Sequence, residues 1–342
     1  MDTTDTNVQS AVEKPPLIRF KPGDPVFIPT LQDVLTTDPD QFVAKYTDIA
    51  AVNMACAEGL SSTRPIDAPK YLALLDEMAA AVRVRVEKSA RLFRLKPAEF
   101  KNSEAVFRVM TMEHVLRVGF GVGYDPAVAE YTRTGKPWFS TDATETFVHG
   151  ILSDKRLGTC STLPVFAVAV GRRCGYPLYF VRVPLHGLYR WHDEREKFNY
   201  QHHEGGGDIQ PDEYYHKWPI EWTESEFAMN ARAGVWLRSM TARQEVSKFL
   251  CNRVFQLRDE GRYAESLDAV RAAKRFDPVN PACGCLEYEL LVKMSVDRLG
   301  ATFNLDCFVR MEPIVISSPV EAMCCARSRA AATVDATDTS AH

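Results

Sequence analysis

No stretch of the sequence approaches ~18 uninterrupted apolar residues, so we expect no membrane-spanning helix. The opening residues, Met1-Asp2-Thr3-Thr4-Asp5, are acidic and polar and lack the cationic and apolar parts of a secretory signal. The formal net charge of −4 gives no reason to expect nucleic acid as the main partner. We therefore expect a cytoplasmic protein that binds neither membrane nor nucleic acid. Export by a route without a cleavable signal would leave no trace in these features.

The sequence also lacks the cysteine patterns of disulfide frameworks and zinc sites. Its nine cysteines are an odd number scattered from Cys56 to Cys325, which favours a reducing compartment. The motif Cys283-Gly284-Cys285 does not have C-x-x-C spacing, and Gly119-Phe120-Gly121-Val122-Gly123 lacks the Lys-Ser/Thr ending of a nucleotide loop. Four histidines match no strong metal template: His192, His202, His203 and His216. We expect neither a metal nor a cofactor.

The composition is that of an ordinary globular protein, with 46% hydrophobic and 25% charged residues. Residues 1–28 are expected to be a disordered or extended segment, and residues 29–140 a helical region. Within the helical region, apolar residues at spacings of three and four predict an amphipathic helix over Ala68–Leu95. A second helix is predicted around Glu104–Arg117, ending where glycines allow the backbone angles of a helix end.

Residues 141–222 carry the pattern of an α+β core. The run Gly158-Thr159-Cys160-Ser161-Thr162-Leu163-Pro164 predicts the start of a helix, with Thr159 as its cap, and Gly175-Tyr176-Pro177 ends it. Three strand-like runs follow: Leu178–Pro184, His186–Trp191 and Lys197–Gln201. We expect a helix carrying Cys160 to pack on an antiparallel sheet, with Gly205–Asp208 as a flexible loop over or beside the site.

Residues 223–300 are predicted to be helical again, with helices over 245–259 and 262–275. Five positions match the small residues, the aromatic residue and the closing proline of a tetratricopeptide repeat: Gly261, Tyr263, Ala264, Ala273 and Pro278. A degenerate second copy begins near Pro281. One repeat cannot bury its own apolar face, so it should pack on the main domain, as a buttress or as a surface for a protein partner. Residues 301–342 are expected to be an extended segment and a disordered tail.

The order Cys160, His186, Asn199 is that of a thiol nucleophile, its base and the group that orients the base. A helix N-terminus and a nearby imidazole both favour the thiolate, and backbone amides at the helix start can bind an oxyanion. Adjacent strands lie ~4.8 Å apart, so an amide on one strand can reach a histidine on the next. Asp193 is a rival third residue, but it falls in a predicted turn.

The central region resembles the bacterial transglutaminase-like superfamily. The matching residues are His149-Gly150, Arg156, Gly158-Thr159-Cys160-Ser161, Val168-Ala169-Val170-Gly171-Arg172-Arg173, Gly175-Tyr176-Pro177, His186, Arg190-Trp191 and Phe198-Asn199. The resemblance covers roughly residues 145–220 and implies a papain-like α+β fold, with Cys160 as nucleophile and His186 as base. The third position of that superfamily usually holds aspartate, so Asn199 departs from its pattern.

The hypothesis that follows is a cysteine enzyme that acts on an amide or thioester bond through Cys160, His186 and Asn199. Water as acceptor would make it a peptidase or amidase, and an amine would make it a transglutaminase; the substrate would be a protein or peptide. Candidate walls of the cleft are Trp138, Trp191, Tyr200 and the triglycine segment Gly205–Gly207. The alternative is a catalytically inactive, transglutaminase-like module that binds a protein partner on its old cleft and helical repeat.

Overall fold

The computed structural model describes residues 15–16, 20, 26–46, 48–61, 65–133, 142–183, 186–218, 221, 223–225 and 236–299. The predicted tail 301–342, most of the predicted segment 1–28, and Trp138 lie outside the described residues. The described part mixes helices with a four-stranded antiparallel sheet and a two-stranded parallel sheet, which is compatible with the expected α+β class. None of its helices is both long and apolar enough to cross a membrane.

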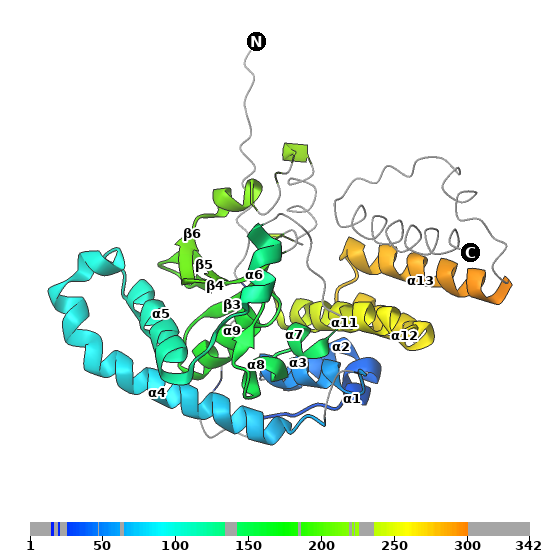
Figure 1. The fold of residues 1–342 in the computed structure, drawn as a ribbon, viewed down its shortest axis with the longest axis horizontal. Helices are drawn as coiled ribbons and strands as arrows, with labels where there is room; N and C mark the ends of the chain where they lie inside the picture. The colour runs from blue at the N-terminus through cyan, green and yellow to red at the C-terminus, as the bar shows by residue number, and fades with distance from the viewer. Residues whose placement is uncertain are drawn as a thin grey trace, which may run out of the picture.

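The first part of the chain is helical. Its helices are α1 (Leu31–Thr36), α2 (Pro39–Lys45), α3 (Ile49–Ala57), α4 (Ala68–Leu95), the 3₁₀ turn η1 (Pro97–Phe100), α5 (Glu104–His114) and the π turn η2 (Val115–Gly119). Helices α1 to α4 begin where a side-chain oxygen accepts a backbone N–H, at Thr30, Asp38, Asp48 and Asp67. The predicted helix over Ala68–Leu95 is confirmed with the same bounds, and Figure 1 shows it running along one side of the molecule.

Short elements then lead to the sheet. They are β1 (Gly123–Tyr124), α6 (Pro126–Arg133), α7 (Ala143–Thr146), α8 (His149–Leu152), β2 (Leu157–Gly158) and α9 (Leu163–Arg173). Strands β1 and β2 pair in parallel, with Tyr124 opposite Gly158. This pairing ties the end of η2 to the segment that enters α9.

The four-stranded sheet has the order β3-β4-β5-β6. Its strands are β3 (Leu178–Val183), β4 (His186–His192), β5 (Lys197–His203) and β6 (Gly206–Gln210). The three predicted strands are confirmed. The predicted flexible loop at Gly205–Asp208 is wrong, because Gly206–Gln210 pairs with β5. Glycine makes this possible: Gly206 has φ +131°, and a Cβ on Gly207 would lie 2.5 Å from the Gln201 carbonyl oxygen.

The two faces of this sheet have different neighbours. On one face, which we call the α9 face, the side chains of Phe180, Tyr189 and Tyr200 belong to the main hydrophobic core with α9. On the other, the outer face, Val181, Val183 and Leu188 pack against Tyr215 of the 3₁₀ turn η3 (Asp212–His216). Successive residues of a strand point to opposite faces, so the register assigns every strand residue to one of them.

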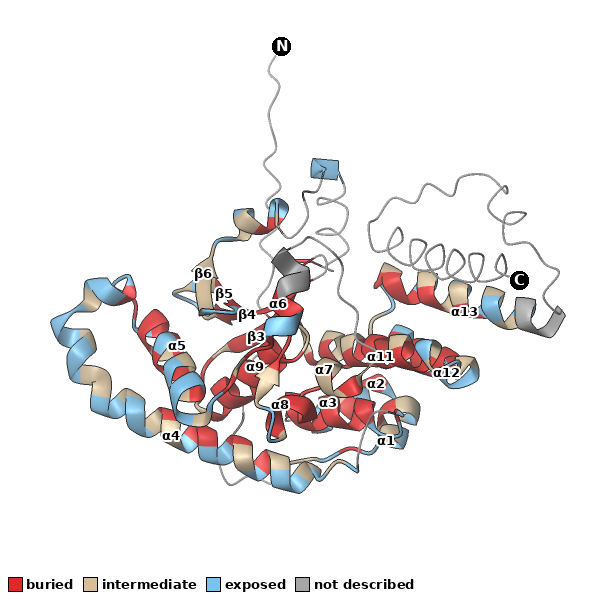
Figure 2. Ribbon diagram, in the orientation of Figure 1, coloured by how far each residue is buried: buried red, intermediate tan, exposed pale blue. Residues whose placement is uncertain are grey.

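Three helices complete the described chain: α11 (Ala242–Asp259), α12 (Tyr263–Phe276) and α13 (Pro281–Leu299). The break between α11 and α12 falls at Gly261, which has φ +75°, as a left-handed turn residue requires. Helices α11 and α12 pack along each other, and α12 packs against α13. Figure 2 shows that the sides of α11 and α12 facing the rest of the protein are buried.

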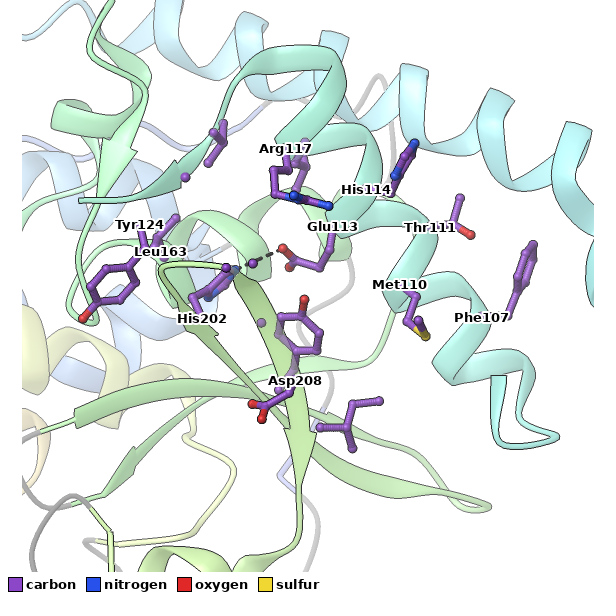
Figure 3. Close-up of a pocket in the computed structure, with 18 of the residues that line it drawn as sticks. Phe107, Met110, Thr111, Glu113, His114, Arg117, Tyr124, Leu163, His202 and Asp208 are labelled. Atoms are coloured by element: carbon purple, nitrogen blue, oxygen red, sulfur yellow. Dashed lines mark hydrogen bonds and ion pairs between the residues drawn. The ribbon is translucent and has the colours of Figure 1, made fainter. Parts of the chain in front are cut away.

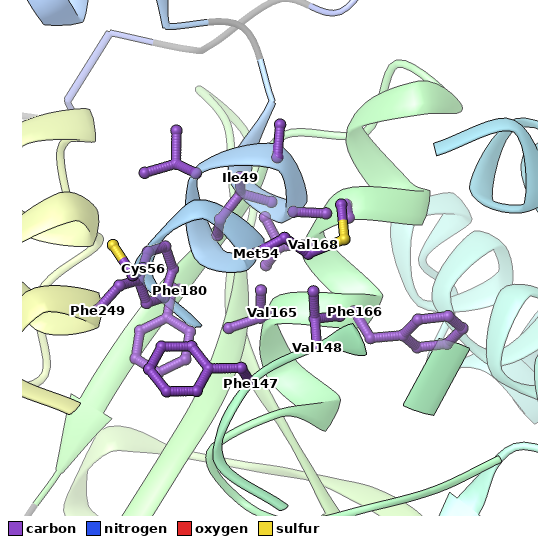
Figure 4. Close-up of a cluster of buried hydrophobic side chains, with 14 of the residues drawn as sticks. Ile49, Met54, Cys56, Phe147, Val148, Val165, Phe166, Val168, Phe180 and Phe249 are labelled. Atoms are coloured by element: carbon purple, nitrogen blue, oxygen red, sulfur yellow. The ribbon is translucent and has the colours of Figure 1, made fainter. Parts of the chain in front are cut away.

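Helix α3 lies at the centre of the packing. All nine of its residues are buried, and it contacts α1, α4, α9 and α11. Figure 4 shows its side chains Ile49 and Met54 among those of α9, the sheet and α11, including Val165, Phe180 and Phe249. A helix that is buried all round is expected only where neighbours cover every side.

Candidate functional site

Cys160 lies in the turn between β2 and α9, three residues before the first residue of α9 (163 − 160 = 3). The predicted cap is wrong: the residue that precedes α9 is Thr162, and the Thr159 hydroxyl accepts the Ser161 N–H at 3.0 Å instead. The Thr162 hydroxyl in turn accepts the Thr159 N–H at 2.8 Å. These two threonine side chains close the turn that presents Cys160.

Three polar groups favour the thiolate of Cys160 and are donors: the backbone N–H of Gly187, the N–H of Cys160 itself and the side chain of Tyr124. Burial raises the pKa of the thiol, and these donors, with the positive charge of Lys248, lower it; the net result is a pKa above the ordinary value. The thiol is therefore half-buried among groups that favour its negative charge.

Gly187 is the residue of β4 that touches Cys160. A Cβ added to Gly187 would lie 2.5 Å from the Cys160 carbonyl oxygen, so only glycine allows this approach. The contact places Cys160 on the α9 face of the sheet. The start of β4 thus reaches Cys160, as the sequence predicts.

His186 precedes Gly187 and is paired with Val183, so its side chain belongs to the outer face. Its ring meets Trp218 edge to face, with the ring centroids 4.7 Å apart. Burial, with a smaller contribution from the charge of His202, lowers the pKa of His186 to about 3. The predicted base is therefore a neutral ring on the face opposite Cys160.

Asn199 also lies on the outer face, paired with Arg190. Its Oδ1 accepts from Arg190 Nε at 2.6 Å, and its Nδ2 donates to Asp212 Oδ1 at 2.7 Å. Arg190 and Asp212 also form an ion pair, with 2.5 Å between Nη2 and Oδ1. The Asn199 amide thus joins a buried arginine to a carboxylate, and both ends of the amide are used in doing so.

The rival third residue, Asp193, lies in the β4–β5 turn as predicted. Its carboxylate accepts from the Trp191 indole at 2.9 Å and from the N–H groups of Arg195 and Glu196, both at 2.8 Å. These bonds close the turn, so Asp193 has a structural role there.

The structure reveals an imidazole–carboxylate pair on the α9 face. His202 of β5 contacts Tyr189 and Tyr200, and its Nε2 lies 3.1 Å from Oε2 of Glu113 on α5. The other carboxylate oxygen of Glu113 accepts the Tyr189 hydroxyl at 2.7 Å. Figure 3 shows the His202 ring and the Glu113 carboxylate directed toward each other. Sequence reasoning weighed His202 only as a metal ligand.

A groove of about 720 Å³ opens between α4, α5 and η2 on one side and β5 and β6 on the other. Its lining includes Glu113, Tyr124, Leu163, Tyr200, His202 and the triglycine segment 205–207 (Figure 3). Tyr200 and the triglycine segment were predicted as cleft walls, and both line this groove. Tyr124, which lines the groove, also lies near Cys160, whereas Cys160 itself is not one of the lining residues.

Among the residues that the structure describes, no three or more His, Cys, Asp or Glu side chains are grouped to hold a metal ion. His202, His203 and His216 are spread over β5 and the outer turn η3.

In comparisons with protein-family models, curated proteins and solved structures, the chain has no significant match.

Proposed function

We propose that the chain is a transglutaminase-like cysteine enzyme that cleaves or transfers an acyl group at an amide or thioester bond, with Cys160 as nucleophile. We place its activity in the cytoplasm, on a protein or peptide substrate. The observation that carries the proposal is the position of Cys160 in the turn before α9 and against Gly187 of β4, where backbone N–H donors favour its thiolate, near a groove of about 720 Å³.

The chemistry follows from these donors. The Cys160 thiolate attacks the carbonyl carbon and forms a C–S bond, and the carbonyl oxygen takes up the negative charge. The N–H groups of Gly187 and Cys160 belong to the backbone, so they can hold that charge without reorganising. The C–N bond then breaks, the amine leaves with a proton, and water or a second amine attacks the thioester.

The test compares Cys160 with Cys174, which follows the last residue of the same helix and is also half-buried. Burial raises the pKa of Cys174 to about 11 even though Arg83 and Arg173 lower it, so Cys174 is a matched half-buried thiol at the other end of the helix. We expect iodoacetamide near neutral pH to alkylate Cys160 about tenfold faster or more. We also expect p-nitrophenyl acetate to acylate the wild type but not Cys160→Ser. Equal, slow labelling of the two thiols would refute the proposal.

One observation favours a second candidate, the inactive binding module. The predicted base His186 and its partner Asn199 belong to the outer face, and burial raises the pKa of the Cys160 thiol. In that case the groove would hold a partner without turning it over. Cys160→Ser would then change neither labelling of the other thiols nor acylation by p-nitrophenyl acetate.

A further inference from the structure

We propose that His202, oriented by Glu113, is the imidazole that takes the proton of Cys160. The inference rests on the proposed function, and it assigns the base to a residue 16 positions beyond the one that the sequence order selects (202 − 186 = 16).

The register of β4 and β5 places His202 on the same face of the sheet as Gly187. Tyr189 pairs with Tyr200; Gly187 lies two residues before Tyr189 and His202 two residues after Tyr200, so both residues belong to the same face of the sheet as this pair. Gly187 lies against Cys160, because a Cβ added to it would stand 2.5 Å from the Cys160 carbonyl oxygen, so His202 shares a sheet face with the strand residue that touches Cys160. The side chain of His202 points to the α9 face, where Cys160 lies.

The hydrogen bonds of the His202 ring determine which of its nitrogens can accept a proton. A carboxylate only accepts, so Glu113 fixes the neutral tautomer in which His202 Nε2 carries the proton. Nδ1 then holds the lone pair. In the described part of the chain this atom is buried and has no hydrogen-bond partner. A buried, unpartnered basic nitrogen is costly unless it serves a ligand or a reaction.

The surroundings of the His202 ring differ from those of the His186 ring. His202 is 8% exposed and lines the groove together with Tyr124, whose side chain is one of the groups that favour the Cys160 thiolate. His186 lines no part of this groove and lies against Trp218 on the outer face. His202, but not His186, therefore lines the groove whose wall includes Tyr124, next to Cys160.

The proton balance is simple. His202 Nδ1 takes the thiol proton as the sulfur bonds to the carbonyl carbon, and the imidazolium is stabilised by the Glu113 carboxylate. The same proton passes to the leaving nitrogen as the C–N bond breaks. In the second half, Nδ1 takes a proton from the attacking water or amine and returns it to the Cys160 sulfur as the thioester breaks. Glu113 stays ionised throughout and is a positioning residue.

The experiment measures the rate of p-nitrophenyl acetate acylation and of iodoacetamide alkylation at Cys160, in the full chain. We expect His202→Ala to lower both rates roughly 100-fold, as loss of a general base does, and free imidazole to restore part of the loss. Two matched variants, His186→Ala and His203→Ala, remove a ring from the outer face and from the exposed residue next to His202. Both should stay within about threefold of the wild type.

Glu113→Gln tests orientation, because glutamine preserves shape but loses the charge. We expect it to lower kcat more than it raises KM and to shift the pH profile of acylation, whereas Glu113→Asp restores part of kcat. Far-UV circular dichroism checks that each variant folds, and His202→Gln replaces the alanine variant if that one does not. If His202→Ala acylates as fast as the wild type while Cys160→Ser is inactive, this inference fails and the proposed function stands. If Cys160→Ser is as active as the wild type, both fail.

Discussion

Replacing Glu245 with glutamine removes a charge from an ion pair that has almost no contact with solvent. The exposed fraction of the side chain is 3% for Arg172 and 0% for Glu245, and the two groups meet through contacts of 2.6 and 3.1 Å. Tyr46, which follows α2, donates to the same carboxylate at 2.6 Å, and Arg172 Nε donates to the Leu178 carbonyl at 3.0 Å. One carboxylate therefore joins α2, α9 and α11.

The expected magnitude follows from burial. Removing one partner of a buried pair leaves an uncompensated charge and costs about 3–5 kcal/mol. Glutamine keeps one acceptor oxygen for Arg172 or Tyr46, so we expect Glu245→Gln to lie near the lower value, about 3 kcal/mol. The free energy of unfolding is measured by urea titration, followed by circular dichroism and by tryptophan fluorescence. The two signals must give the same midpoint for the value to be used.

The control is an exposed pair on the neighbouring helix. Arg262 and Glu265 meet at 2.5 Å with side chains 29% and 54% exposed. We expect Glu265→Gln to cost at most about 1 kcal/mol, because water screens the pair. A second variant, Arg172→Met with Glu245→Leu, removes both charges and should recover much of the loss. If Glu245→Gln costs no more than Glu265→Gln, the assignment of this carboxylate as a structural centre is wrong.

Three further predictions concern single sites. Burial, opposed by the charge of Asp142, lowers the pKa of His149 to about 4 from 6.5, so the unfolded chain takes up the proton first as the pH falls. The free energy of unfolding should therefore fall by up to about 3 kcal/mol as the pH drops from 6.5 to about 4. Urea titrations of His149→Met over the same pH range should lack this decrease. Cys251 and Cys283 have their sulfurs 3.8 Å apart, so hydrogen peroxide should convert them into a disulfide, giving water; failure to find the cross-linked peptide by mass spectrometry would refute this. Gly187→Ala should cost about 1–3 kcal/mol, since its Cβ would strike the Cys160 carbonyl, and an unchanged urea midpoint would contradict the contact.

Local signals in the sequence predicted most of the elements. The spacing of Leu72, Leu75, Met78 and Val82 predicted α4, and all four side chains are buried. Glycine marked the break between α11 and α12 in the same way, since Gly261 adopts a positive φ. These signals depend on residues close together in the chain, so no tertiary information is needed to read them.

The faces of the sheet could not be predicted, for a physical reason. Every residue of β4 from His186 to Trp191 is buried, so no polar–apolar alternation shows which side chains face α9. The order of Cys160, His186 and Asn199 therefore said nothing about the face that each occupies. Glycine at 187 was the one available signal, because a missing side chain beside the expected base marks a close backbone approach.

The pairing of His202 with Glu113 joins residues 89 positions apart, on a strand and on a helix of different regions. No spacing rule connects them. Only the packing of α5 beside the sheet, which places the groove between them, brings the two side chains together.

The central position of α3 has a consequence for synthesis of the chain. Helix α3 is made before α11, which covers part of it and begins at Ala242; Arg253 of α11 donates to the Cys56 carbonyl at 3.0 Å across 197 residues. Until α11 leaves the ribosome, one side of the apolar helix α3 remains uncovered. The growing polypeptide should depend on chaperones during this interval, and a protein truncated before α11 should aggregate.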